Sequence, residues 1–348
     1  MQELQPRVHT DAIIEFINII DAHAHADFLA SRKSAACFLN EHTVPANKRE
    51  SLNHKIRLGR EMRGLSARRT HLGPLDQTAK RPTAGVGAIS NTNDNLIPLP
   101  VQTEAFETFH DQGRAIIYAY AITPNTCLLV CVLYCYTGAH ENHEQAAKTD
   151  ELFRAAFLEL AHHPDIPTII CTDLNADPDD IPILKDAICE GKWHDIGSDP
   201  TKTTSQGVQN TCFNHNSQKG TRRDYVFADP IAYNSIDSFQ ALRFDEVPVH
   251  ALLQVRLNLS IHDLSNRKLA TTPSLSQIFE DYIAKLVGEN FEEAQTIRSK
   301  ATQALHEHLD AYMDQHCDDE YLSRLTLEQH WRELNKYIVQ ALTTFFGR

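Results

Sequence analysis

The sequence predicts a mixed α/β domain with mostly antiparallel strands, followed by a helical tail. Two apolar segments, RAIIYAYAI and CLLVCVLYCY, are joined by TPNT at 123–126, a pattern typical of a β-hairpin. Apolar residues then recur at helical spacing over 143–161, which predicts an amphipathic helix. From about residue 260 the pattern is helical as far as Phe346. We therefore expect one domain over 1–259 and a helical extension over 260–348.

The other elements of the first domain follow from short apolar segments. IIEFINII at 13–20 predicts a buried strand, and AACFL at 35–39 and AGVGAIS at 84–90 predict two shorter ones. After the helix, TIICTDLNADP predicts a strand that runs into a polar loop, and DDIPILKDAICEG predicts a short helix closed by a glycine. Three further strands are expected in RDYVFAD, IDSFQALRF and HALLQVRL.

Length and composition fit a folded protein. The 348 residues are 42% hydrophobic and 23% charged, enough apolar material for one large domain or two ordinary ones. No apolar run is long enough to span a bilayer, and the N-terminus has no secretory pattern. The eight cysteines form no CxxC pair. We expect an intracellular protein, in the nucleus or the cytoplasm, with no membrane association, and the sequence points to no partner protein.

The charge is distributed unevenly along the chain. A net charge of −13 argues against a nucleic-acid binder. Residues 31–81, however, hold twelve Lys or Arg against four acids, so this window is +8 and the remainder is −21. A local basic patch can bind phosphate on an acidic protein, but a basic window can equally be a solvated face. Both interpretations stay open at this point.

The segment NIIDAHAHADF at 18–28 suggests a metal site. Two histidines one residue apart in a strand, His23 and His25, would point the same way and could share an ion, as in an amidohydrolase. Such an enzyme would need a barrel and further ligands at later strand ends, and the later histidines do not supply them. We therefore favour a loop just past the first strand, at the rim of the active site, for both histidines.

A different group of residues carries acid–base chemistry at strand ends. Asp173 and Asn175 are two apart in DLN, so both side chains leave the strand on one face. An Asp that accepts a proton from water, beside an Asn that holds a phosphate oxygen, would suit phosphodiester hydrolysis. Asp224 paired with His250 would orient the imidazole and stabilise its charged form. Taken alone, Asp173 and Asn175 could instead cap a loop, and Asp224 could pair with a neighbouring arginine.

The motifs CTDLNADP, RRDYVFAD and VPVHALLQV, in this order, resemble those of the endonuclease/exonuclease/phosphatase superfamily. FLNEHTVP resembles its second strand, with Glu41 at the metal position, and FINII its first strand, with Asn18 near the metal. VLYCYTGAHEN resembles the strand that ends in the active-site tyrosine, which is Tyr134 here, with Tyr136 as the alternative. The resemblance spans residues 12–258 and is greatest to endonuclease domains of LINE-type retrotransposons and their apurinic-endonuclease relatives.

The resemblance implies a fold and a chemistry. The fold would be a four-layered αββα sandwich of two mostly antiparallel sheets. Magnesium, with manganese as an alternative, would be held by Glu41 and Asn18 and would act on the phosphodiester of DNA. Asp173 would be the general base, and the other catalytic residues would be Asn175, Tyr134, His250 and Asp224. The residues expected to bind the DNA are Lys48, Arg49, Arg222 and Arg223.

Three positions depart from the family pattern. Val249 stands where the family has an Asp before the final His, Ile20 replaces an acid near Asn18, with Asp21 one position further on, and Thr172 replaces a Gly. Such changes fit either a working nuclease of a divergent branch or a degenerate retroelement copy that keeps the fold. A phosphatase of small molecules or lipids on the same fold is a further alternative. In retroelements a helical connector leads to a reverse transcriptase, and the tail from 260 could be such a connector.

Overall fold

The computed structural model describes residues 11–76, 84–91, 96–123, 126–203, 209–213 and 220–258, together with Gln303. The chain divides into two units, Met1–Leu269 and Ala270–Arg348. The helical extension predicted for 260–348 lies outside the described residues apart from Gln303, so the extension and its boundary at 259 stay predictions. All other described residues belong to the first unit.

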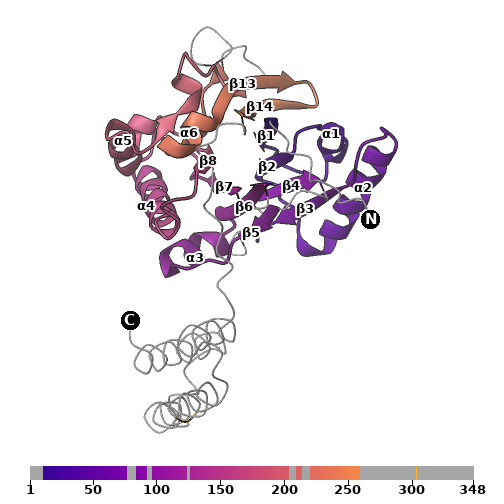
Figure 1. Cartoon of the computed structure of the whole chain (residues 1–348), viewed down its shortest axis with the longest axis horizontal. Coiled ribbons are helices and arrows are strands. Elements are labelled where there is room, and N and C mark those ends of the chain that lie inside the picture. The colour runs from indigo at the N-terminus through magenta and orange to yellow at the C-terminus, as the bar shows by residue number, and fades with distance from the viewer. Residues whose placement is uncertain are drawn as a thin grey trace, which may run out of the picture. The chain divides into compact units, whose positions relative to one another are not determined.

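Two mixed sheets form the centre of this unit (Figure 1). Within the described residues the first sheet has eight strands in the order β11-β10-β14-β1-β2-β4-β3, with β13 also paired to β14. Its strands are β1 (Asp11–Asn18), β2 (Ala36–Asn40), β3 (Arg68–Leu72), β4 (Gly87–Asn91), β10 (Cys212–Phe213), β11 (Gly220–Thr221), β13 (Ile236–Phe244) and β14 (Val247–Asn258). Only β1 and β2 of this set pair in parallel.

The second sheet has six strands within the described residues, in the order β5-β6-β7-β8-β12-β9. They are β5 (Leu96–Pro98), β6 (Ala115–Thr123), β7 (Thr126–Tyr134), β8 (Thr168–Asp173), β9 (His194–Asp195) and β12 (Asp224–Ala228). β7 and β8 pair in parallel and the other pairs are antiparallel. The hairpin predicted around 123–126 is confirmed, since β6 and β7 pair from Ala115 opposite Leu133 to Thr123 opposite Thr126.

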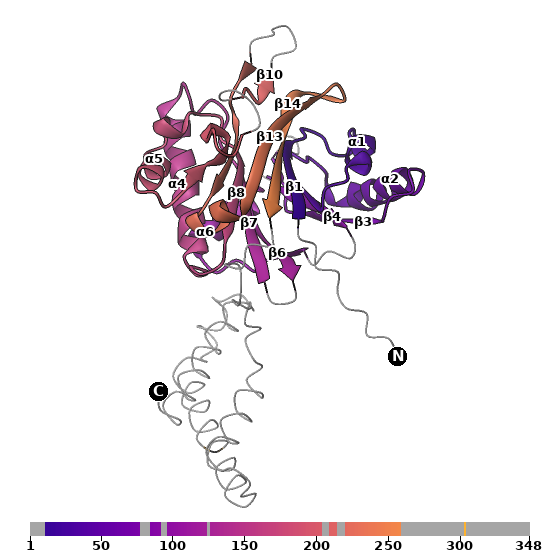
Figure 2. The ribbon, with the colours of Figure 1, turned by 45° about the horizontal axis from the view of Figure 1, so that its top comes forward.

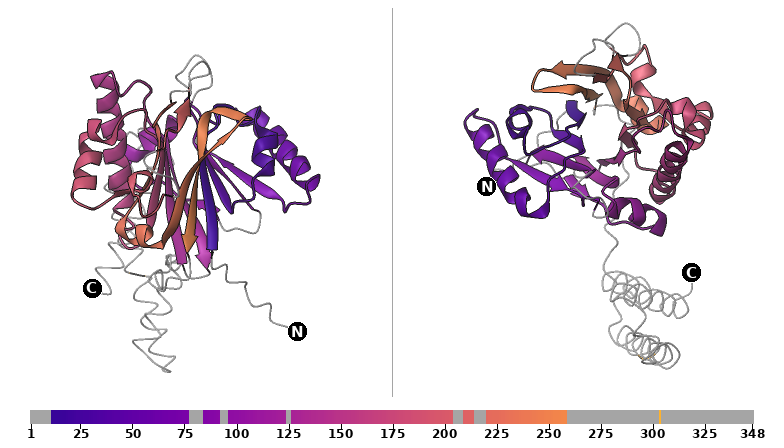
Figure 3. Two further views of the ribbon diagram at one scale, coloured as in Figure 1. Left: turned by 90° about the horizontal axis from the view of Figure 1, so that it is seen from above. Right: turned by 180° about the vertical axis from the view of Figure 1, so that it is seen from behind.

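Helices cover the outer face of each sheet, as Figures 2 and 3 show. α1 and α2 pack on the first sheet, and α3, α4 and α5 pack on the second. The helices are α1 (Ala26–Ser31), α2 (Arg49–Glu61), α3 (Glu104–Asp111), α4 (His143–Leu160), α5 (Pro182–Cys189) and α6 (Pro230–Ser235), with short 3₁₀ turns η1 (Ala46–Lys48), η2 (Pro178–Asp180) and η3 (Ile196–Ser198). The predicted four-layered αββα sandwich is therefore confirmed. None of the described helices is both long and apolar enough to cross a membrane.

Strand β7 shows why the sequence forms these layers. Its residues are apolar at nearly every position, and successive side chains of a strand point to opposite faces. Val130 and Val132 enter the core between the two sheets, while Leu129 and Leu133 enter the core beneath the helices. A strand buried on both faces has to lie inside a sheet that is covered on both sides.

Candidate active site

The site lies where four strands end at the same edge of the sandwich. In the parallel pair β1–β2, Asn18 is opposite Asn40, and in the parallel pair β7–β8, Tyr134 is opposite Asp173. The buried amide of Asn40 donates to the carbonyl of Leu133 at 2.8 Å, which joins the two sheets at this edge. Two strand ends from each sheet are thereby fixed next to one another.

Four of the predicted residues form one hydrogen-bonded chain. The Asn18 amide nitrogen donates to Asp173 Oδ2 and to Glu41 Oε2, both at 2.8 Å. The hydroxyl of Tyr134 donates to Glu41 Oε1 at 2.7 Å. The oxygen of the Asn18 amide accepts from the backbone of Ile20, which fixes the orientation of the amide. Asn18 thus joins the two carboxylates through its nitrogen, and its role on the metal stays a prediction.

Asp224 and His250 form the expected pair. Nδ1 of His250 lies 2.9 Å from Asp224 Oδ2, and both side chains are buried. Asp224 begins β12 of the second sheet, whereas His250 lies in β14 of the first. The alternative in which Asp224 pairs with a neighbouring arginine is wrong, because the carboxylate of Asp224 holds the histidine.

Two site residues have a left-handed backbone. Glu41 has φ 51° and Asn175 has φ 56°, a region that residues other than Gly adopt rarely and mostly at constrained sites. The carbonyl of Asn175 accepts from the backbone of His140, so the loop after β7 holds the DLN loop in place. The side-chain nitrogen of Asn175 is buried and has no partner within the described residues. This amide is therefore free to bind a ligand.

Burial and charge set the protonation of the site. Burial, the negative charge of Asp224 and that of Glu41 raise the pKa of Asp173 to about 7, against the opposing effects of His250 and the Asn18 hydrogen bond. Burial alone would lower the pKa of His250, but the carboxylates of Asp224, Asp173 and Glu41 raise it to about 9. Burial and Glu41 raise the pKa of Tyr134, so its hydroxyl remains a donor.

The donor set at Glu41 and Asp173 suits a hard cation. Within the described residues no group of three or more His, Cys, Asp or Glu side chains is arranged around a single metal position. Magnesium does not require such a cage, since it keeps several waters and is commonly held by one or two carboxylates together with the substrate. Asp173 Oδ1 is buried without a partner in the described part of the chain, so it is an oxygen that a cation or a water could take.

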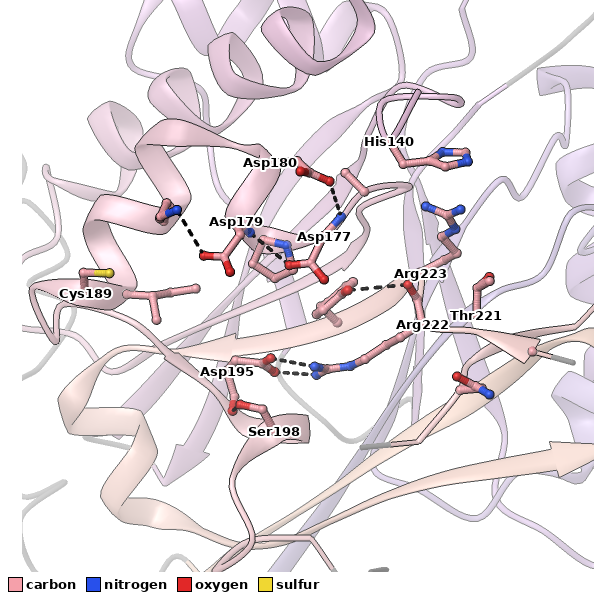
Figure 4. Close-up of a pocket in the computed structure, with 17 residues that line it drawn as sticks. His140, Asp177, Asp179, Asp180, Cys189, Asp195, Ser198, Thr221, Arg222 and Arg223 are labelled. Carbon is pink, nitrogen blue, oxygen red and sulfur yellow. Dashed lines mark hydrogen bonds and ion pairs between the residues drawn. The ribbon is translucent and has the colours of Figure 1, made fainter. Parts of the chain in front are cut away.

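A cavity of about 710 Å³ lies next to these residues (Figure 4). It shares segments with the site, because Ala176 and Asp177 follow Asn175, and Arg222 and Arg223 precede Asp224. Arg223 extends toward His140 in Figure 4, and no described residue accepts a hydrogen bond from its guanidinium. The cavity therefore contains a positively charged side chain, that of Arg223, which directly precedes Asp224 of the site in the chain.

The four predicted DNA-binding residues differ in whether their charge is available to a ligand. Arg222 makes a two-fold hydrogen-bonded ion pair with Asp195 and lies over the ring of Tyr225. Arg49 donates to the carbonyl of Gly73 at 2.6 Å, in the packing of the first sheet. Lys48 is exposed in η1. Of the four, Arg223 and Lys48 have charges available to a ligand, whereas those of Arg222 and Arg49 serve the protein's own structure.

His23 and His25 lie past β1, as we favoured, in a turn before α1. The two ring nitrogens of His23 lie 3.2 Å from Ser51 Oγ and 3.3 Å from Lys55 Nζ. The shared-metal hypothesis is wrong here because β1 ends at Asn18, so the two-residue periodicity that would align the histidines does not continue. The two-sheet sandwich also excludes the barrel of an amidohydrolase.

Tyr134, not its alternative Tyr136, contacts Glu41, since the hydroxyl of Tyr136 donates to Gln112. Sequence reasoning missed Asn40, which links the sheets, and Thr211, whose hydroxyl accepts from the backbone of Arg223 and Asp224. Asn40 precedes Glu41 and could have been noticed as a polar residue that ends an apolar strand. Thr211 lies in a long polar stretch and carries no signal in the sequence.

No protein-family model and no curated protein matches the sequence. Solved structures match the fold. The 3′ phosphatase NExo from Neisseria, bound to a product DNA hairpin, is 14% identical with a TM-score of 0.52, over 71% of this chain and 99% of that chain. An AP endonuclease from Archaeoglobus fulgidus is 15% identical with a TM-score of 0.52, over 70% of this chain and 98% of that chain. The described domain therefore has the fold of the AP endonuclease, exonuclease and phosphatase proteins, as the sequence resemblance predicted.

The endonuclease domain of TRAS1, a telomere-specific non-LTR retrotransposon, is also matched, at 14% identity over 72% of this chain and 99% of that domain. Its TM-score of 0.47 does not separate a retrotransposon endonuclease from other proteins of this fold. The retroelement part of the resemblance accordingly stays a prediction.

Proposed function

We propose that this protein is a Mg²⁺-dependent phosphodiesterase that hydrolyses the DNA backbone. The observation that carries the proposal is the hydrogen-bonded chain from Asp173 through Asn18 and Glu41 to Tyr134, beside the Asp224–His250 pair. This arrangement offers an acidic oxygen for a cation, a base and two proton donors at one point. Phosphodiester hydrolysis requires these groups together.

Each residue has a role that follows from its environment. Asp173 takes the proton of the attacking water, and its raised pKa suits a base that works near neutral pH. The free amide of Asn175 orients that water and a phosphate oxygen. Tyr134 and the protonated ring of His250 donate to the phosphate oxygens, where negative charge grows in the transition state. Asp224 keeps the ring of His250 oriented and charged.

Glu41 is the residue that would hold magnesium, with Mn²⁺ as the substitute ion. When bound, the ion supplies Lewis-acid stabilisation of charge on the phosphate. Asn18 keeps the carboxylate of Glu41 directed toward Asp173, because it donates to both. The hydroxyl of Tyr134 holds the other oxygen of Glu41.

DNA as the substrate is supported by the cavity that adjoins the site. In a polynucleotide the cleaved phosphate has a neighbouring phosphate on either side, and Arg223, which lines the cavity directly before Asp224 in the chain, offers a positive charge to one of them. Of the solved structures with this fold, NExo is bound to a DNA hairpin. The retroelement origin, and a tail that connects to a reverse transcriptase, are further parts of the proposal that rest on the sequence resemblance.

Nicking of supercoiled plasmid in millimolar Mg²⁺ tests the proposal. We expect nicking by the full chain, loss of nicking with EDTA, and loss in Asp173→Ala. Asp111→Ala is a matched control, because Asp111 is exposed at the end of α3, away from the residues that line the cavity, and its carboxylate lies 3.3 Å from the ring of the neighbouring His110. Nicking that persists in Asp173→Ala would contradict the role of Asp173.

Two other outcomes would favour the alternatives. A folded protein that does not nick would favour a degenerate copy, and Val249→Asp would then show whether the missing carboxylate is the cause. Hydrolysis of small phosphoesters without nicking would favour a phosphatase, whose substrate could occupy the cavity, since about 710 Å³ is within the range of small-molecule sites.

A further inference from the structure

Thr211 occupies a junction between the two sheets. Its backbone carbonyl accepts from the amide of Ala251, the residue after His250, at 2.6 Å. Its hydroxyl accepts from the amides of Arg223 and Asp224, at 2.9 and 2.8 Å. Its own amide donates to Thr221 in the neighbouring strand. One residue therefore contacts the strand of His250 through its backbone and the strand of Asp224 through its side chain.

The backbone amides of Arg223 and Asp224 are consecutive in the chain, yet both point to the same acceptor, Thr211 Oγ1. In a regular strand, consecutive amides point in opposite directions, so two neighbours cannot share one acceptor. The chain must therefore bend where β12 begins, and Thr211, which is 1% exposed, accepts both amides away from water. Without the hydroxyl, two buried donors at the base of Asp224 would lose their partner.

The position of Asp224 matters because its partner belongs to the other sheet. The Asp224–His250 contact is 2.9 Å long and crosses from β12 to β14. A small shift of β12 relative to β14 would lengthen this contact, while the cores of the two sheets could stay packed. Thr211 is placed to prevent that shift, since it contacts β12 at Asp224 and β14 beside His250.

We infer that Thr211 is a positioning residue for the Asp224–His250 pair, which it aligns across the two sheets through its hydroxyl. The purpose of the pair in hydrolysis rests on the proposed function, but the alignment itself does not. A readout on the histidine ring therefore distinguishes failure of this inference from failure of the proposed function.

The test follows the ring of His250 by NMR in the full chain without metal. His250→Gln identifies its signal among the 19 histidines. In the wild type we expect the ring to remain protonated well above neutral pH, as its raised pKa requires. Thr211→Val keeps the shape but has no acceptor, and should move the titration midpoint of His250 about one pH unit or more lower. Thr211→Ser keeps the hydroxyl and should titrate as the wild type does.

A second variant covers the case in which the valine variant does not fold. Thr211→Cys is similar in size and offers only a weak acceptor, so it should give a smaller shift in the same direction. A folded valine or cysteine variant that loses thermal stability while His250 titrates as in the wild type would overturn the inference, because Thr211 would then be merely structural. If the wild-type protein does not nick DNA but His250 responds as expected, the proposed function fails and this inference stands.

Discussion

Asp173 and Asp224 lie directly opposite each other in the neighbouring antiparallel strands β8 and β12, and both carboxyl groups are buried. Side chains opposite each other in such a pair share one face of the sheet and lie close together. One oxygen of each carboxyl group has a hydrogen-bond partner, which is Asn18 for Asp173 and His250 for Asp224. The second oxygen of each is buried and has no partner among the described residues. Two acidic groups are thus concentrated at one point before any cation binds.

The first prediction concerns stability against pH in the absence of metal. The pKa of Asp173 rises from 3.8 to about 7 on folding, and that of His250 from 6.5 to about 9. Between its unfolded and its folded pKa, each group binds more protons in the folded protein than in the unfolded chain. The stability that these protons provide is fully present below the unfolded-state pKa and is lost as pH rises through the folded-state pKa. The contribution of these two groups to the free energy of unfolding should therefore fall by a few kcal/mol between about pH 4 and 9, and the difference between the wild type and a variant of each group isolates it from groups of opposite sign such as buried His42, whose pKa is lowered to about 3.

Urea unfolding of the wild type and of two variants measures this. Asp173→Asn should flatten the part between about pH 4 and 7, and His250→Gln the part between about 6.5 and 9. A difference in stability between the wild type and either variant that does not fall as pH rises through that variant's range would contradict the assignment of the group.

The second prediction separates two neighbouring tyrosines. Tyr134→Phe removes the donor to Glu41 Oε1 and should lower nicking about ten-fold or more, as the loss of a group that orients a metal ligand commonly does. Tyr136→Phe is the matched control. Both rings face the guanidinium of Arg114, but the hydroxyl of Tyr136 donates to Gln112. Equal effects of the two variants on nicking would mean that the Glu41 contact is not the cause.

The third prediction contrasts two consecutive arginines. Arg222→Ala leaves the mostly buried carboxylate of Asp195 without its ion-pair partner and should lower the melting temperature by several degrees. Arg223→Ala should leave the melting temperature nearly unchanged, because no described residue accepts a hydrogen bond from its guanidinium. It should weaken DNA binding and reduce the salt dependence by about one phosphate contact. Fluorescence anisotropy with labelled duplex DNA at several salt concentrations measures the binding. A stable Arg222→Ala variant that binds DNA less tightly would contradict this assignment, because Arg222 would then contact the DNA.

The sequence predicted the strands of the first sheet better than the helices that cover it. β13 spans the segment IDSFQALRF that was predicted for it, and α4 differs from its prediction by one residue. α2 was missed because its buried positions Leu52 and Ile56 are surrounded by charged residues, so the apolar stripe is too narrow to recognise. The basic charges of that window therefore left two interpretations open, phosphate binding and a solvated face.

Parts of the site could be predicted because they depend on spacing along one strand. Asp173 and Asn175 belong to this class. The contacts of Asn18 with Glu41 and of Arg222 with Asp195 depend on how separate segments meet, which no local pattern contains. Thr211 is the extreme case, because its role exists only where two sheets approach each other.

The last prediction uses Asn18 to locate the cation. Its amide nitrogen lies 2.8 Å from oxygens of both Glu41 and Asp173. Asn18→Asp replaces this donor with a third carboxylate, so without metal it should lower the melting temperature by repulsion. Added Mg²⁺ should then raise the melting temperature more than in the wild type, since three carboxylates bind a hard cation more tightly than two. Asn18→Ala loses the same hydrogen bonds without adding charge and should show no such gain. Thermal unfolding with MgCl₂, against NaCl of equal ionic strength, measures the difference, and equal Mg²⁺ shifts in the two variants would place the cation elsewhere.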